Sequence, residues 1–190
     1  IGPKTKGYYC SVIAILMLFL QFSKEDSGKW ISRMLKTIDL IPDIAKQTKQ
    51  WYESEKDELK RFKNIIVIGY DKCIPAATEG ALKILETVQC CVRYYELEEF
   101  MHGIYHGIDK STLILALGNQ SRHLERMIRL LGYLKEHKNA TTYLISQNKV
   151  TKHDFSYPFI EDSLFVSFEY LTVLQVLGEL MCHDRGIDLY

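Results

Sequence analysis

The segment from Ile65 to Gly69 constrains the fold most, because it joins four consecutive β-branched residues to a glycine. Apolar runs of this kind are typical of strands that are buried on both faces of a parallel sheet. Similar β-type segments alternate with amphipathic helical segments along the rest of the chain, which indicates helices on both faces of the sheet. We therefore predict an α/β fold, a three-layer αβα sandwich around a doubly wound five-stranded parallel sheet.

The expected elements divide the chain into a helical part and a sheet domain. Residues 1–23 and 24–62 form the helical part, and residues 63–190 form the domain. The residue before a proline avoids the helical region, so Ile41-Pro42 is expected to separate two helices of the helical part. The strands are expected at 64–68, 91–95, 112–117, 141–146 and 156–160, and the helices at 7–23, 29–40, 43–62, 75–88, 120–137 and 162–184.

The run at residues 8–22, within the first expected helix, is apolar almost all round. A membrane span needs roughly 20 apolar residues, and this run is shorter and includes Ser11 and Gln21. It also lacks a small-residue cleavage site of the kind that ends a signal peptide. A helix that is apolar on all sides is normally buried, and we predict that this one is buried too.

Charge and cysteine content narrow the class of protein. Lys plus Arg equals Asp plus Glu, 24 of each, so the chain has no basic surface excess for nucleic acid or an anionic membrane. The five cysteines have no CxxC spacing, and Cys90-Cys91 falls in an expected strand. We expect reduced, buried thiols in a cytoplasmic protein.

A stripe of charge marks the helix that follows the first strand. Glu79, Lys83 and Glu86 stand at positions i, i+4 and i+7, so they share one helix face, while the residues between them are small or apolar. Open α/β sheets bind their ligands at the carboxyl ends of the strands, and we predict that the stripe lines a cleft there. The alternative is an ordinary surface ion pair on a helix.

Other candidate sites have weaker support. Glu99, His102 and His106 contain metal-binding residue types, but Gly103 and Gly107 interrupt any helix that would align them. Residues 118–121 could hold an anion at a helix start, although they lack the Ser/Thr-rich character of a phosphate loop. No GxGxxG or P-loop motif occurs. We expect no metal and no cofactor.

Several of these residues together resemble the sugar isomerase (SIS) domain family. They are Gly69, the run Glu79-Gly80-Ala81-Leu82-Lys83 with Glu86, then Glu99 and His102-Gly103. The likeness is to the second domain of two-domain phosphosugar isomerases and fructosamine-6-phosphate deglycases, such as the isomerase half of glucosamine-6-phosphate synthase. The Ile1–Gly7 segment, with the apolar helix after it, resembles the end of such a protein's first domain.

The resemblance implies roles for these residues. Glu86 would be the base that moves a proton between adjacent sugar carbons, and His102 would open the ring of the cyclic substrate. Lys83 and Glu79 would orient the base and polarise substrate oxygens. Glu99 and Gly69 would contribute to substrate binding. The ligand would be a phosphorylated sugar or amino sugar, and the site would lie near the interface of a homodimer.

Three departures from the family pattern qualify this interpretation. Ile104 replaces the proline that commonly follows His-Gly, and the Ser/Thr-rich phosphate loop and a C-terminal lysine are not in the chain. We interpret the chain as the C-terminal part of a longer protein. Isomerase and deglycase remain open, and a non-catalytic sugar-phosphate sensor is the alternative function.

Overall fold

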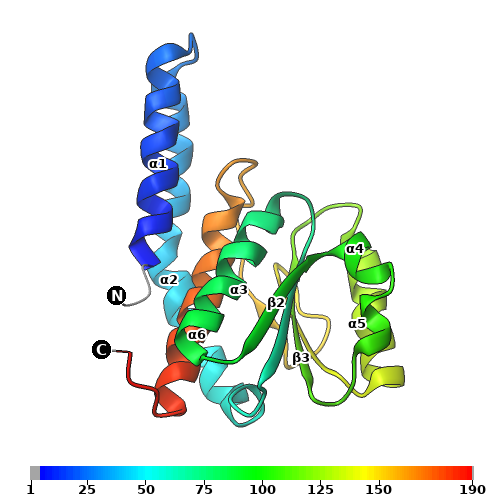
Figure 1. The fold of residues 1–190 in the computed structure, drawn as a ribbon. Helices are drawn as coiled ribbons and strands as arrows, with labels where there is room; N and C mark the ends of the chain where they lie inside the picture. The colour runs from blue at the N-terminus through cyan, green and yellow to red at the C-terminus, as the bar shows by residue number, and fades with distance from the viewer. Residues whose placement is uncertain (1–4, 190) are drawn as a thin grey trace.

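The computed structural model describes residues 5–189, so the first four residues of the Ile1–Gly7 segment lie outside the described part. The sheet domain is preceded by a helical hairpin that stands away from it (Figure 1). The elements are α1 (Thr5–Phe22), α2 (Ser27–Leu59), β1 (Asn64–Gly69), a 3₁₀ turn (Asp71–Cys73), α3 (Ile74–Val88), β2 (Cys91–Glu96), α4 (Leu97–Met101), a second 3₁₀ turn (Ile104–Gly107), β3 (Thr112–Gly118), α5 (Leu124–Lys138), β4 (Thr141–Ser146), β5 (Phe155–Ser156) and α6 (Val166–Asp184).

The sheet confirms the predicted doubly wound topology. Its five strands are all parallel and lie in the order β2-β1-β3-β4-β5. The chain therefore moves outward from β1 to β2 and then returns to the other side of β1, so the winding direction reverses between β1 and β3. A reversal of this kind opens a crevice at the carboxyl edge of an α/β sheet.

Alternate residues of β1 serve the two faces of the sheet. Ile65 and Val67 pack in the core formed with α2, α3 and α6, whereas Ile66 and Ile68 pack in the core formed with α4 and α5. Side chains of a strand point alternately to opposite faces, so a strand covered on both sides must be apolar throughout. Helices on both faces are thus confirmed, as the β-branched run predicted.

The predicted break at Pro42 is wrong. Helix α2 runs without interruption from Ser27 to Leu59, with Pro42 inside it. An internal proline costs a helix about 3 kcal/mol. Burial on either side of Pro42 offsets this cost, because Met34 packs against α1 and the domain while Ile44 and Tyr52 are buried in the main core.

The predicted helix at the N-terminus is confirmed, but its predicted burial is wrong. Only Leu20 of α1 is buried, and Phe19 and Phe22 are 63 % and 89 % exposed. The helix is covered on one side only, because it packs along the first half of α2 in the projecting hairpin (Figure 1). By length and composition α1 could span a membrane, a test that core helices and signal sequences also pass.

The predicted burial of the thiols is only partly correct. All five cysteines are free, and Cys73 and Cys182 are buried, but Cys10 and Cys91 are exposed and Cys90 is half-buried. Cys91 is exposed because it starts β2, an edge strand of the sheet, whereas Cys90 lies just before that strand and packs partly against the main core. Position in the sheet order, which the local sequence does not specify, decides this burial.

Candidate active site

Helix α3 packs very closely against α6, and this contact determines how the helix is rotated and where its charged residues lie. Pro75 opens the helix, and Gln89 ends it in the left-handed conformation with φ 50°. Gly80 touches α6 so closely that an added Cβ would lie 2.1 Å from Leu174 Cδ1. The small buried residues of the motif therefore serve helix packing, while the positions between them carry the charge.

The three charged residues of the motif form one linked group on the face of α3 next to the Gly80 contact, where Lys83 shares a cavity with residues of α6. Lys83 Nζ lies 2.8 Å from a carboxylate oxygen of Glu86 and 3.4 Å from one of Glu79. Lys83 is only 6 % exposed, whereas both carboxylates are half-buried. Burial tends to lower the pKa of this ammonium, but the two carboxylates outweigh it and raise the pKa above its usual value. Lys83 therefore stays charged and holds Glu79 and Glu86 on either side of it.

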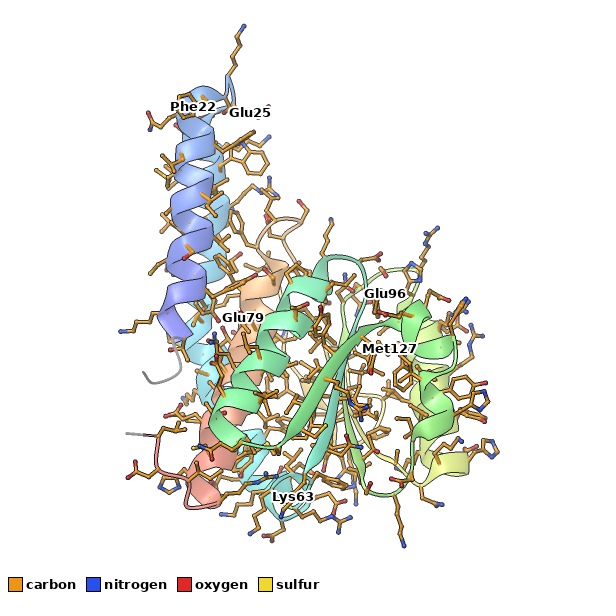
Figure 2. All side chains as sticks on the ribbon, in the orientation of Figure 1. Phe22, Glu25, Lys63, Glu79, Glu96 and Met127 are labelled. Atoms are coloured by element: carbon orange, nitrogen blue, oxygen red, sulfur yellow. The ribbon has the colours of Figure 1, made fainter. Side chains whose placement is uncertain are left out.

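A cavity of about 680 Å³ lies beside this group, between the base of the hairpin, α3, α6 and the C-terminal segment. Lys83 and Thr87 line it from α3, and Lys6 and Tyr9 line it from α1. Figure 2 shows Glu79 on the side of α3 that is turned toward the hairpin. The predicted position at the carboxyl edge is wrong, because the stripe runs along α3 beside this cavity, and Glu86 lies in the last turn of the helix, just before β2 begins.

Tyr9 is a polar residue of this cavity that sequence reasoning missed. Its hydroxyl lies 2.9 Å from Thr172 Oγ1 and donates to Gln175 Oε1 at 3.1 Å. Burial, together with the nearby negative charge of Glu79, raises the pKa of Tyr9 to about 12. The contact joins α1 to α6 across 163 residues of sequence, so no local pattern could have revealed it.

His102 is not brought to Glu86 within one chain. It is exposed and follows α4, where its Nδ1 lies 3.0 Å from the carbonyl oxygen of Glu98. Helix α4 covers one face of the sheet and α3 the other, so Glu86 and His102 lie on opposite sides. Glu99 is also exposed, in the last turn of α4 beside His102.

Gly69 has a clear packing role at the end of β1. It is buried, and a Cβ there would lie 3.1 Å from the Cβ of Ala77 and 3.2 Å from the carbonyl oxygen of Cys73. The glycine thus lets α3 start directly against the strand that precedes it. Its predicted part in substrate binding stays a prediction.

Two weaker candidate sites, a metal site and an anion site in residues 118–121, can also be compared with the structure. Within residues 5–189, no three or more His, Cys, Asp or Glu side chains gather in a group that could hold a metal ion. In the loop after β3, the backbone N–H of Gln120 donates to a carboxylate oxygen of Glu161 at 2.8 Å. A carboxylate of the chain itself therefore takes the donor that an anion would need there.

Comparison with known proteins gives a consistent result. The family model described as SIS domain matches residues 58–152. The glutamine–fructose-6-phosphate aminotransferase (isomerizing) of Wigglesworthia glossinidia brevipalpis is 25 % identical over 196 residues, which cover 97 % of this chain and 32 % of that protein. The corresponding enzyme of Caldanaerobacter subterraneus is 26 % identical, again over 97 % of this chain and 32 % of the relative. The chain spans about a third of the length of these curated relatives.

Solved structures show the same likeness. A candidate phosphosugar isomerase of Clostridium difficile 630 superposes with a TM-score of 0.86 and 28 % identity, covering 97 % of this chain and 54 % of that one. The C-terminal domain of the glucosamine-fructose-6-phosphate aminotransferase of Francisella tularensis shares the fold, with a TM-score of 0.71 at 18 % identity over 85 % of this chain and 46 % of that one. The similarity thus extends over the helical hairpin as well as the sheet domain.

Proposed function

The chain belongs to the SIS domain family, and we propose that it supplies the proton-transfer residues of a phosphosugar aldose–ketose isomerase. One observation carries the proposal: the buried ammonium of Lys83 holds two half-buried carboxylates, Glu79 and Glu86, beside a cavity. A purely structural surface pair would leave its lysine in solvent, where such pairs contribute little to stability.

Glu86 is the proposed base. An enediol mechanism needs a carboxylate that can take a proton from one sugar carbon and return it to the next. The Glu86 side chain is 36 % exposed, so it can reach a ligand, and its contact with Lys83 orients it. Lys83 and Glu79 act as positioning residues, and Lys83 can also stabilise negative charge that develops on a substrate oxygen.

His102 is proposed to act in the site of a second copy of the chain. It lies across the sheet from Glu86, so the two side chains can serve one substrate only if they come from different subunits. An exposed histidine on a short loop is suited to such a contact, because its ring can exchange a proton near neutral pH. We therefore propose a homodimer whose active sites lie near the interface. We also propose a cytoplasmic location, which the five free thiols support.

The relatives support a proposal for the type of substrate. The names of the curated relatives include fructose 6-phosphate, and this chain corresponds to about a third of their length. We propose a 6-phosphosugar as ligand. Deglycation of a fructosamine 6-phosphate is the second candidate reaction, because it would use the same base and the same ring-opening group.

The test compares two carboxylate variants in the protein that carries this chain. Glu86→Gln is expected to lower turnover of fructose 6-phosphate or glucosamine 6-phosphate by about 10²–10⁴-fold with little change in ligand affinity. Glu125→Gln removes an exposed carboxylate from a similar helical ion pair on α5 and is expected to have no effect. Normal turnover by Glu86→Gln would refute the assignment of the base.

Mixing two inactive variants tests the shared site. A dimer of one Glu86→Gln and one His102→Asn subunit contains one site with both native residues if they come from different subunits. Equal mixing should then restore roughly a quarter of the native activity. If mixing restores nothing while hybrid dimers form, the two residues do not act across subunits.

Substrate assays separate the remaining alternatives. Amine release from fructosamine 6-phosphates indicates a deglycase, and interconversion of ketose and aldose 6-phosphates indicates an isomerase. If the native protein binds a phosphosugar at micromolar concentration and performs neither reaction, the sensor function replaces the enzyme.

A further inference from the structure

A cavity of about 530 Å³ lies at the amino edge of the sheet, where the parallel strands β1 and β3 begin. Residues 61–64 line it from the segment that leads into β1, and Lys110 and Ser111 line it from the turn that leads into β3. Figure 2 shows Lys63 at the opposite end of the molecule from the tip of the hairpin. The cavity is therefore remote from the carboxyl edge of the sheet.

Positive charge is concentrated around this cavity. Arg61, Lys63 and Lys110 line it and are exposed, and within residues 5–189 no carboxylate lines it with them. Lys63 and Lys110 form no ion pair within this part of the chain, so both ammonium groups can bind an anion. Arg93 lies beside the cavity, because its guanidinium donates to Asn64 Oδ1 at 2.9 Å. The chain as a whole is neutral, so these cations are a local excess.

The two carboxylates nearest to these cations are already engaged. Glu58 pairs with Arg61 at 2.7 Å and accepts a hydrogen bond from the Thr141 hydroxyl at 2.9 Å. Asp109 accepts hydrogen bonds from the backbone N–H and the hydroxyl of Ser111, at 2.8 and 2.6 Å. They offset part of the positive charge, and the unpaired lysines keep the rest.

The end of α2 would otherwise oppose an anion here. Helix α2 ends at Leu59, and the carbonyl groups at the end of a helix carry partial negative charge. The Arg185 guanidinium donates to the carbonyl oxygen of Lys60 at 2.9 Å and also to that of Phe62, which lines the cavity. Arg185 thus covers two carbonyl oxygens and brings a further positive charge to this edge of the sheet.

We propose that this cavity binds a small anion that carries two linked phosphate groups. Its volume is in the usual range for small-molecule sites and is larger than a single phosphate needs. Guanidinium and ammonium groups bind phosphate oxygens through charge-assisted hydrogen bonds. Arg61 and Lys63 can hold one phosphate from the β1 side, and Lys110 can hold the other from the β3 side. Among the described residues, this cavity and the Lys83 cavity have no lining residue in common, so the proposal does not rest on the proposed function.

The experiment titrates the protein with inorganic diphosphate at low and at high ionic strength, and with inorganic phosphate for comparison. Binding is followed by calorimetry and by the amide NMR signals of residues 61–64 and 110–111. We expect diphosphate to bind more tightly than phosphate, to shift these signals, and to bind more weakly in added salt, because the lining charges are exposed. The double variant Lys63→Gln with Lys110→Gln should weaken diphosphate binding about tenfold, since each exposed charge contributes a few-fold.

A charge-matched control separates this cavity from the net charge of the protein. Lys149→Gln with Lys152→Gln removes two exposed lysines from the loop after β4, at the other edge of the sheet, and should leave diphosphate binding unchanged. Glu86→Gln, which alters the proposed active site, should also leave it unchanged. The proposal is overturned if diphosphate does not bind at low ionic strength, if phosphate binds as tightly, if the Lys63 and Lys110 double variant binds diphosphate as the native protein does, or if the control double variant weakens binding equally.

Discussion

The close contact of α3 with α6 makes a quantitative prediction about Gly80. An alanine at an exposed helical position gains about 1 kcal/mol over glycine. At Gly80 the new Cβ would lie 2.1 Å from Leu174 Cδ1 and 2.9 Å from Leu174 Cβ. The second atom cannot rotate away, and Leu174 is fully buried, so the overpacking cost should reach the upper part of the usual range, about 3 kcal/mol. Gly80→Ala should therefore destabilise the protein by about 2 kcal/mol.

Gly132 provides a matched control at the middle of another 15-residue helix. It is exposed, and nothing lies within 4 Å of a Cβ added there, so Gly132→Ala should show the helix gain alone. Thermal unfolding followed by far-UV circular dichroism should place the midpoint of Gly132→Ala about 2–4 °C above the native protein and that of Gly80→Ala about 4–8 °C below it.

A third glycine tests the reasoning between these extremes. A Cβ at Gly178 would lie 2.9 Å from Thr87 Oγ1, while its next neighbours are 3.5 Å away, so only one side chain must move. The midpoints should rank Gly132→Ala above Gly178→Ala above Gly80→Ala. If Gly80→Ala unfolds at or above the native temperature, the small residues of the motif are not there to let α3 approach α6.

Two further predictions concern pH and the exposed hairpin. Burial raises the pKa of Glu169 from 4.5 to about 6, although two backbone N–H groups that bond to it oppose this rise. The stability that this carboxyl group contributes is therefore full below about pH 4.5 and is lost as pH rises through 6. The unfolding midpoint should fall less between pH 5 and 7 in Glu169→Gln than in the native protein, and equal slopes would contradict this. The apolar face of α1 should make residues 1–190 self-associate, and Leu18→Gln with Phe22→Gln should shift size-exclusion elution toward the monomer; a monomeric native chain would contradict it.

Local sequence was sufficient to predict most of the sheet. It was insufficient where contacts between distant segments determine the bounds of an element. Strand β4 was predicted with its bounds, since residues 141–146 are rich in β-branched and aromatic residues and lie between polar turns. Helices α5 and α6 start four residues later than predicted, at Leu124 and Val166, and β5 is limited to two residues. The continuous α2 was missed because the pre-proline rule describes only neighbouring residues, whereas the burial of Ile44 depends on the whole domain.

In the candidate site, too, local spacing predicted one part, and contacts between distant segments determine the other. The spacing of Glu79, Lys83 and Glu86 was sufficient to predict their shared face, because three and four residues separate neighbours on a helix. The cavity beside Lys83 depends on α1 meeting α6, through contacts such as that of Tyr9 with Thr172. No periodicity in the sequence encodes such a meeting, so the cavity required the structure.

The continuous α2 has a mechanical consequence for the hairpin. Pro42 removes the hydrogen bond to the carbonyl of Ile38. It lies within the stretch of α2 that contacts the domain, because Arg33 pairs with Asp162 and Met34 packs with Phe168. The arm from Pro42 to Ser27 is about 22 Å long at 1.5 Å per residue, so a bend of about 10° would carry its tip about 4 Å. Because α1 packs along this arm, such a bend would move the loop after Phe22 much farther than it moves the base of the hairpin, beside the Lys83 cavity. A pair of spectroscopic labels on that loop and on the sheet would register the bend as a change in distance.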